Sequence, residues 1–241
     1  MVFSMGSSLR PTERRAIIAL MDRFFRLRLP LLCSALLLGC GLLAARPILA
    51  APSAVLMVFG DSLSAEYGLA RGSGWVALLD RRLQQSGHEL QIVNASVSGE
   101  TTAGGRSRFS AALARHRPRW VLIELGANDA LRGLALESTE ANLRAMVLTA
   151  RESGAEPILI GMKIPPNFGV SYSERFEAVF ARVAKSQKTP FVPFLLAGIA
   201  DSGPMKAEYF QDDRIHPNAR AQAQIADNVL AVLLPALEHK R

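Results

Sequence analysis

Five short apolar segments recur along the chain, and they restrict its fold more than any other feature. They occupy residues 55–59, 90–93, 120–125, 157–160 and 191–194. Longer segments, in which apolar residues recur at helical spacing, separate them. Strands that are apolar throughout are typical of a parallel sheet that helices cover on both faces. The sequence therefore predicts a single α/β domain, a three-layer α/β/α sandwich with a mostly parallel five-stranded sheet.

The first 50 residues of the 241-residue chain differ in character from the rest. A basic stretch with Arg23, Arg26 and Arg28 comes first, and an apolar run over residues 29–45 follows it. Two small residues, Ala50 and Ala51, then mark the boundary with the rest of the chain. This order is typical of a secretory signal peptide. We therefore expect residues 1–50 to be a leader, and residues 51–241 to form the domain in the periplasm or outside the cell.

Two other fates of the leader remain open. Its apolar run has 17 residues. A membrane-spanning helix needs about 17 to 25, so an uncleaved membrane anchor is one alternative. Leu37-Leu38-Gly39-Cys40 resembles the cleavage motif of bacterial lipoproteins, which makes a lipid-anchored form the other alternative.

The basic excess of the chain is confined to the leader. The formal net charge is +7 for the whole chain, and seven arginines against Glu13 and Asp22 give +5 to residues 1–50 and leave +2 for the rest. With no Lys/Arg cluster in the remainder, a nucleic-acid partner is not expected. Both cysteines, Cys33 and Cys40, also lie in the leader, so the domain depends on its apolar core rather than on a disulfide. The sequence predicts no obligate protein partner.

A serine and an Asp/His pair stand at opposite ends of the predicted domain. Ser62 follows the first strand, at the carboxyl edge of the sheet, where α/β proteins bind ligands. His216 can accept the serine proton, because imidazole exchanges protons near neutral pH. Asp213, three residues earlier, can orient the other ring nitrogen. Pro217 suits a first helical turn, which predicts His216 at the start of the last helix. These residues indicate a serine hydrolase with Ser62, Asp213 and His216 as catalytic residues.

The loops after the first three strands offer hydrogen-bond donors for an oxyanion. The expected donors are the backbone N–H groups of Ser62 and Gly99 and the side-chain amide of Asn128. Asp61 is expected to organise the turn beneath the serine. Asp129 is expected to bond backbone N–H groups of its own loop and to help orient Asn128.

Together these blocks resemble the SGNH (GDSL-type) hydrolase family, which is named for the serine, glycine, asparagine and histidine of its four motifs. Here they match Ser62, Gly99, Asn128 and His216. The resemblance runs from about residue 55 to residue 234. The segments between the motifs resemble the bacterial arylesterase and multifunctional thioesterase/lysophospholipase branch, notably Asn94-Ala95-Ser96-Val97-Ser98-Gly99-Glu100-Thr101, Pro118-Arg119-Trp120-Val121-Leu122 and Pro165-Pro166-Asn167-Phe168-Gly169.

The resemblance implies a flavodoxin-like sheet and a secreted serine esterase that needs no metal or other cofactor. It implies as substrates short to medium acyl or aryl esters, with thioesters and lysophospholipids as further candidates. In the thioesterase of this branch, the loop that carries the asparagine moves over the acyl chain. The resemblance therefore places Leu131 and Leu134 in the substrate-binding site, together with Ile164 and Pro165 from the loop after the fourth strand.

Two residues depart from the pattern of the branch. Glu66 brings a carboxylate near Ser62 where a small residue is common, and Arg214 stands where several relatives carry glycine. Both argue against an acyl-CoA substrate. His88 and His116 lie in polar turns with no further ligand at metal-binding spacing, so a metal site is not expected.

Two other functions remain alternatives. A carbohydrate O-acetyl esterase would use the same residues but prefer acetyl groups, whereas the apolar residues of the expected substrate site indicate room for longer chains. A non-catalytic flavodoxin-like protein would hold phosphate or flavin in the glycine- and serine-bearing loops. No loop has the glycine pattern of a dinucleotide or P-loop site, which argues against this second alternative.

Overall fold

A computed structural model describes residues 53–164, 166–201 and 206–238, which belong to one compact unit, Pro52–Arg241. Within them lies a five-stranded sheet in the order β2-β1-β3-β4-β5, with every neighbouring pair parallel. The strands are β1 (Ala54–Gly60), β2 (Leu90–Asn94), β3 (Trp120–Glu124), β4 (Glu156–Ile160) and β5 (Phe191–Val192). This order is that of the flavodoxin-like sheets. The predicted α/β class and sheet are confirmed.

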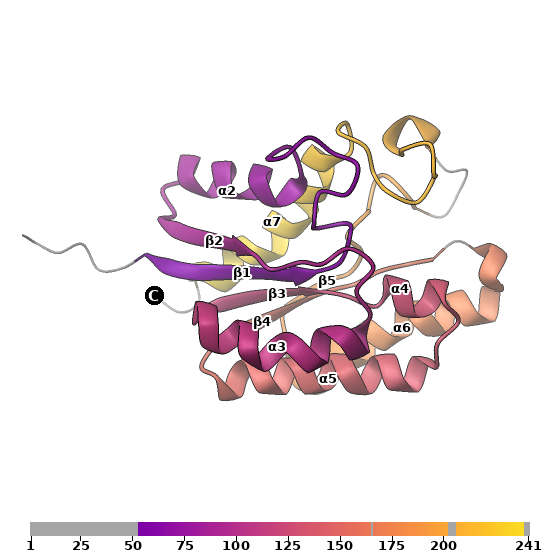
Figure 1. Cartoon of the computed structure of the whole chain (residues 1–241), viewed down its shortest axis with the longest axis horizontal. Helices are drawn as coiled ribbons and strands as arrows, with labels where there is room; N and C mark the ends of the chain where they lie inside the picture. Colours follow the sequence, from indigo (N-terminus) through magenta and orange to yellow (C-terminus); the bar gives the residue numbers. More distant parts are fainter. Residues whose placement is uncertain (1–52, 165, 202–205, 239–241) are drawn as a thin grey trace, which may run out of the picture. The chain divides into compact units, whose positions relative to one another are not determined.

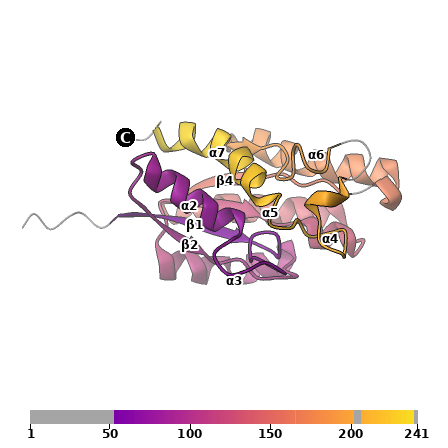
Figure 2. The same cartoon turned by 90° about the horizontal axis from the view of Figure 1, so that it is seen from above.

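Helices cover both faces of the sheet. Figures 1 and 2 show α2 (Trp75–Gln85) and α7 (Gln222–Glu238) on one face, and α3 (Thr102–His116), α5 (Leu136–Glu152) and α6 (Val170–Gln187) on the other. Three short helical segments lie in loops: α4 (Ala127–Leu131), η1 (Pro166–Phe168) and η2 (Ala207–Tyr209). The three-layer prediction is therefore also confirmed.

The topology brings the loops after β1 and β3 together. From β1 the chain steps to β2 on one side, and then continues to β3, β4 and β5 on the other. Because crossovers between parallel strands are right-handed, this reversal puts α2 and α3 on opposite faces. Open α/β sheets bind ligands at the carboxyl edge beside such a reversal, which here lies between β1 and β3.

The core follows the apolar pattern of the strands. Every residue of β3 is buried, and edge strand β2 is only partly buried. An edge-to-face aromatic pair joins the sheet to a helix: Phe59 of β1 packs against Phe109 of α3 with ring centroids 4.8 Å apart. A similar pair, Phe176 and Phe180, lies within α6 with centroids 5.2 Å apart.

Two differences from the sequence prediction go beyond a one-residue shift at a strand end. Strand β5 ends at Val192 rather than at residue 194, because Pro193 has no N–H to continue the ladder. The last helix begins at Gln222 rather than at Pro217, which instead forms an antiparallel bridge with Phe210. The prediction that His216 lies at a helix start was therefore wrong, and His216 lies on a loop closed by this bridge.

The predicted leader, residues 1–50, with its anchored and lipoprotein alternatives, lies outside the described residues. In the part of the chain that the structure covers, no helix is both long and apolar enough to cross a membrane.

Gly105 lies where α3 packs tightly against β1 and the residue after β3. A Cβ atom at this position would overlap Leu125 Cδ1 and lie 3.3 Å from Phe59 Cε1, both fully buried. At the neighbouring Gly104, a Cβ atom would meet first the carboxylate end of Glu100, which belongs to a longer and more adaptable side chain.

We expect Gly105→Ala to be less stable than Gly104→Ala by about 1 to 3 kcal/mol, the usual cost of overpacking a tight core. Both changes gain a similar helix propensity, up to about 1 kcal/mol, so the comparison reports the difference in packing cost, which at Gly104 includes any shift of the Glu100 carboxylate from Arg108. Urea unfolding of the two variants measures the difference. Equal stabilities would mean that α3 can move away from the sheet without cost.

Candidate functional site

Ser62 lies in a tight turn directly after β1. The turn is closed by the backbone, since the N–H groups of Ser64 and Ala65 donate to the carbonyl oxygen of Asp61 at 3.2 and 2.9 Å. The Asp61 carboxylate also accepts the Leu63 N–H at 3.0 Å. Asp61 thus organises the turn, as expected, and leaves the Ser62 side chain half-buried at the carboxyl edge of the sheet.

The structure brings Ser62, His216 and Asp213 into one line of hydrogen bonds. His216 Nε2 lies 3.0 Å from Ser62 Oγ, and His216 Nδ1 lies 2.6 Å from Asp213 Oδ2. The other Asp213 oxygen accepts the backbone N–H groups of Ile215 and His216 at 2.9 and 3.0 Å. The Asp213–His216 pair is therefore held within one four-residue turn.

Arg214 occupies the left-handed region of this turn, with φ of +58°. Glycine adopts that conformation at little cost, whereas other residues adopt it rarely. The backbone of this turn would therefore accommodate glycine at lower cost than Arg214, whose side chain is exposed.

The Asp213 carboxyl is held in its ionised form. Burial raises its pKa, but the backbone N–H groups of His216 and Ile215, followed by the His216 ring, outweigh this and lower the pKa from 3.8 to about 2. Asp213 is consequently an anion at any pH at which the protein would be expected to work, which suits a group that orients an imidazole ring.

Gln211 joins the turn after β1 to the loop that carries His216. Its side-chain amide donates to the carbonyl oxygen of Tyr67 at 2.8 Å and to that of Pro217 at 3.2 Å, and its backbone N–H donates to the His216 carbonyl at 2.8 Å. Gln222 makes a second link, because it accepts the Trp75 N–H at 2.9 Å and donates to the Pro217 carbonyl. These hydrogen bonds hold the stretch between β1 and α2 in a fixed position relative to the loop that carries His216.

The three expected oxyanion donors lie on the loops after β1, β2 and β3. Within the described part of the chain, the N–H groups of Ser62 and Gly99 donate to no protein acceptor. Gly99 has φ of +78°, and its carbonyl oxygen accepts from Arg132 at 2.9 Å. The Asn128 amide donates one hydrogen to Asp61 Oδ2 at 2.9 Å, which fixes the side chain and leaves its second N–H for a ligand.

Asp129 has different partners from those expected. Instead of its own loop, its carboxylate accepts the backbone N–H of Thr102 at 2.8 Å and the hydroxyl groups of Thr102 and Thr139. The first N–H groups of a helix need acceptors from elsewhere, and Asp129 supplies one to α3. Asp129 therefore fixes the Asn128 loop by tying α4 to α3 and α5.

Glu66 also has a structural role that the sequence did not reveal. Its carboxylate accepts the backbone N–H groups of Gly72 and Gly74 at 2.9 and 2.8 Å, which closes the loop before α2. The charge that was expected to act beside Ser62 is bound to these two donors. Glu66 therefore gives little support to the argument against an acyl-CoA substrate.

The residues expected to bind the acyl chain are not equally accessible. Leu134 is 41% exposed, and its carbonyl oxygen accepts the Tyr172 hydroxyl at 3.1 Å. Leu131 is half-buried, whereas Ile164 is buried within the apolar core. Pro165 lies outside the described residues.

Glu124 is the main residue of this site that the sequence reading missed. It ends β3 and is 0% exposed. Its Oε2 atom accepts the Asp61 N–H at 3.2 Å and the Ser64 hydroxyl at 2.7 Å. Among the described residues, its Oε1 atom has no hydrogen-bond partner. A carboxyl group at the end of an otherwise apolar strand was the available signal.

Two buried carboxyl groups therefore lie beneath the turn. Burial, followed by the charge of Asp61, raises the pKa of Glu124 well above its ordinary value. Burial also raises the pKa of Asp61, from 3.8 to about 6, although hydrogen bonds from Leu63 and Asn128 oppose this. Glu124 keeps its proton well above the pH at which a free carboxyl loses it, and Asp61 is the anion at neutral pH.

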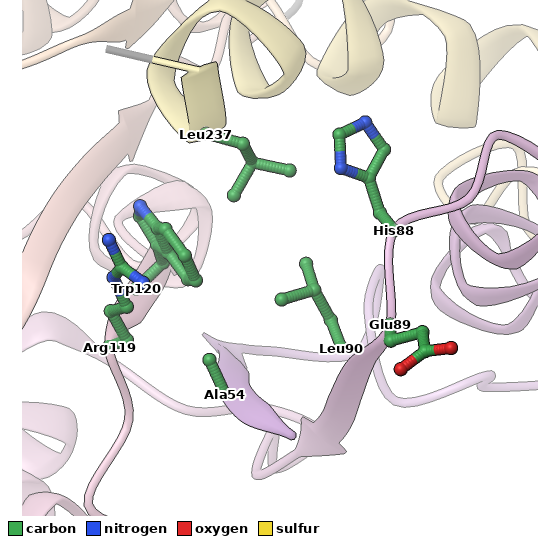
Figure 3. Close-up of a pocket in the computed structure, with 7 residues that line it drawn as sticks. All are labelled: Ala54, His88, Glu89, Leu90, Arg119, Trp120 and Leu237. Atoms are coloured by element: carbon green, nitrogen blue, oxygen red, sulfur yellow. The ribbon is translucent and has the colours of Figure 1, made fainter. Parts of the chain in front are cut away.

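A cavity of about 170 Å³ lies at the opposite edge of the sheet, around the first residues of β1, β2 and β3 (Figure 3). Its lining residues are Ala54, His88, Glu89, Leu90, Arg119, Trp120 and Leu237. None of them belongs to the candidate site. Among the described residues, no cluster of three or more His, Cys, Asp or Glu side chains could hold a metal ion.

Known proteins resemble this chain in sequence and in fold. The profile of the GDSL-like Lipase/Acylhydrolase family matches residues 58–224. The chain is 45% identical to Esterase TesA of Pseudomonas aeruginosa over 187 residues, which cover 78% of this chain and 91% of the relative. It is 40% identical to Thioesterase 1/protease 1/lysophospholipase L1 of Escherichia coli K12 over 190 residues (79% and 88%) and 37% identical to an arylesterase of Vibrio mimicus over 182 residues (76% and 89%). A crystal structure of TesA, 45% identical, superimposes with a TM-score of 0.71 over 75% of this chain and 98% of that chain.

Two substitutions test the role of Glu124 in stability. We expect Glu124→Gln to fold normally, because an amide oxygen still accepts from Asp61 and Ser64. We expect Glu124→Leu to be destabilised by about 1 to 3 kcal/mol for each buried donor left without an acceptor. Denaturant unfolding of both variants measures this, and equal stability would contradict the role.

The same variants give a pH signature. The pKa of Glu124 is raised on folding, so its contribution to stability is complete below the unfolded value of 4.5 and is lost as the pH rises through the folded value. The wild type should therefore lose stability relative to Glu124→Gln as the pH rises from 4.5 to the folded value, by up to about 1.4 kcal/mol per pH unit, and lose no more above it. A constant difference between the two from pH 4 to pH 8 would show that Glu124 titrates normally.

Proposed function

The chain belongs to the GDSL-like lipase/acylhydrolase family, as its resemblance to the SGNH hydrolases predicted, and is a carboxylic ester hydrolase; we propose that it cleaves esters through an acyl-enzyme on Ser62. The observation that carries this proposal is the line of hydrogen bonds from Ser62 Oγ to His216 Nε2 at 3.0 Å and from His216 Nδ1 to Asp213 at 2.6 Å. A nucleophile, a base and an orienting carboxylate in contact are the parts that such a mechanism needs.

In the first step, His216 Nε2 takes the proton of Ser62 as Oγ bonds to the carbonyl carbon of the ester. The electron pair of the C=O bond moves onto oxygen, where the N–H groups of Ser62 and Gly99 and the free N–H of Asn128 would bind it. Losing one such donor typically costs about 2.7 to 4 kcal/mol. Asp213, ionised to about pH 2, stabilises the imidazolium formed in this step.

The tetrahedral intermediate then collapses. The bond between the carbonyl carbon and the leaving oxygen breaks, and His216 gives its proton to that oxygen, so an alcohol departs and the acyl group stays on Ser62. Water repeats the sequence: it gives a proton to His216, attacks the acyl carbon and releases a carboxylic acid, and the proton returns to Ser62.

The proposed substrates are short to medium acyl or aryl esters, with thioesters and lysophospholipids as further candidates. Two observations support this range. The relatives carry the names esterase, arylesterase and thioesterase/lysophospholipase. Leu134, on the loop that carries Asn128, offers exposed apolar surface at the same sheet edge as Ser62. The family assignment also favours hydrolysis over the non-catalytic alternative.

Export remains part of the proposal. The basic and apolar pattern of residues 1–50 supports a cleaved leader and a periplasmic or secreted enzyme. Mass spectrometry of the mature N-terminus tests it: a chain that begins near residue 51 supports cleavage, and a chain that retains residues 29–45 supports an anchor.

We expect Ser62→Ala to reduce the hydrolysis of p-nitrophenyl butyrate by about 10⁴-fold or more, since subtilisin-type enzymes lose about 10⁶ when the nucleophile is removed. A fluorophosphonate should label the wild type at Ser62, and mass spectrometry should find no label in the variant. Ser107→Ala, an exposed serine of α3, is the matched control and should keep full activity. Activity in Ser62→Ala would remove this serine from its role.

A chain-length series separates the proposal from the O-acetyl esterase alternative. We expect kcat/KM for p-nitrophenyl esters to rise from acetyl to butyryl or hexanoyl. Each methylene that contacts apolar surface should stabilise the transition state by about 1 kcal/mol. Leu134→Ser should flatten that rise without changing the rate for acetyl. A steep fall beyond acetyl in the wild type would favour the sugar esterase.

A further inference from the structure

Tyr67 places an aromatic ring against the proposed catalytic base. The ring centroids of Tyr67 and His216 lie 4.3 Å apart, with the ring planes tilted by 39°. Tyr67 is nevertheless 50% exposed, unlike Phe59, Phe109, Phe176 and Phe180 in the core. One part of the ring thus covers the imidazole and another part faces solvent.

The backbone holds this ring in a defined place. The Tyr67 N–H donates to the carbonyl oxygen of Ser62 at 3.4 Å, and the Tyr67 carbonyl accepts from Gln211 at 2.8 Å. Tyr67 is therefore tied to the serine turn on one side and to the His216 loop on the other. An exposed tyrosine held by both segments is better ordered than a surface residue with no such contacts.

The direction of proton transfer determines what approaches this ring. In the mechanism above, His216 Nε2 must come within about 2.6 to 3.2 Å of the leaving oxygen to protonate it. The atoms bonded to that oxygen then lie beside the imidazole and beside the Tyr67 ring that covers it. The oxyanion donors Gly99 and Asn128 lie on the loops after β2 and β3, so the carbonyl oxygen points elsewhere.

The residues expected to meet the leaving group and those expected to meet the acyl group lie on different sides of the sheet. Figure 1 shows the loop after β1 and the loop before α7 on the side of α2 and α7, and α4 on the side of α3 and α5. Tyr67 and His216 belong to the first pair of loops, and Asn128 and Leu134 belong to α4 and the loop that follows it.

We propose that Tyr67 forms the leaving-group subsite and favours aryl over alkyl leaving groups. The proposal rests on the Ser62–His216 mechanism and assigns its substrate class on the alcohol side. The exposed part of the Tyr67 ring is available to an aryl group in an offset or edge-to-face arrangement, which aromatic pairs prefer. Ile215, next to His216 and 50% exposed, adds apolar surface on the same loop.

The test compares two esters of one acid in three proteins. The substrates are phenyl butyrate and trifluoroethyl butyrate, and the proteins are the wild type, Tyr67→Phe and Tyr67→Leu. The measured quantity is the ratio of kcat/KM for the phenyl ester to that for the alkyl ester. A general loss of proton transfer by His216 slows the alkyl ester more, because trifluoroethoxide is the poorer leaving group, so it would raise this ratio rather than lower it.

We expect Tyr67→Phe to keep the wild-type ratio and Tyr67→Leu to lower it by about three- to tenfold, the worth of one aromatic pair. Phenol added as an inhibitor should bind more weakly to Tyr67→Leu by a similar factor. An unchanged ratio in Tyr67→Leu would overturn the proposal and leave Tyr67 as a support for His216. A ratio that falls equally in Tyr67→Phe would overturn it too, because the hydroxyl group would then be responsible.

Failure of the underlying mechanism would look different. Fluorophosphonate labelling of Ser62 in all three proteins shows that the mechanism holds, whatever the ratio. A wild type that turns over both esters without a labelled Ser62 would reject the mechanism itself. Because Tyr67 is half-exposed, its variants are expected to fold, and thermal unfolding checks this.

Discussion

The buried carboxyl group of Glu124 is the interaction on which the candidate site depends. It stands at the end of the central strand β3 and binds the first backbone N–H of the serine turn and the Ser64 hydroxyl. A side chain at Gly60 would overlap the same carboxyl oxygen, so glycine is required where β1 meets the turn. The position of Ser62 is thereby fixed relative to the fully buried central strand of the sheet rather than to a surface loop.

A second set of hydrogen bonds extends from the contact between Glu124 and the serine turn to the asparagine loop. Asp61, whose backbone Glu124 binds, uses its own carboxylate to hold the Asn128 amide. Asp129, the next residue, is held in turn by the first residue of α3 and by Thr139 of α5. The serine turn and the asparagine loop are therefore not independent, and a change at β3 would be felt at both the nucleophile and an oxyanion donor.

Much of the fold and of the site could be predicted from the sequence, because it depends on local patterns. Apolar runs of strand length revealed the sheet, and the short spacing between Asp213 and His216 predicted their contact. The partners of Glu66, Glu124 and Asp129 could not be predicted in the same way. Each carboxylate binds donors whose positions depend on the folded loops, up to 63 residues away in the case of Glu124 and Asp61. The start of α7 was missed because Pro217 suits a bridge as well as a helical turn.

Ser62 lies on one segment and the Asp213–His216 pair on another, and this separation determines how activity would be lost on heating. Asp213 and His216 are joined within one turn and need no other part of the chain to meet. The contact with Ser62 must cross between separate loops, and Gln211, Gln222 and the ring of Tyr67 are among the side chains that span the gap. Surface loops open at a lower free energy than the sheet that carries them. A modest rise in temperature should therefore abolish esterase activity reversibly while the circular dichroism spectrum is still that of the native fold.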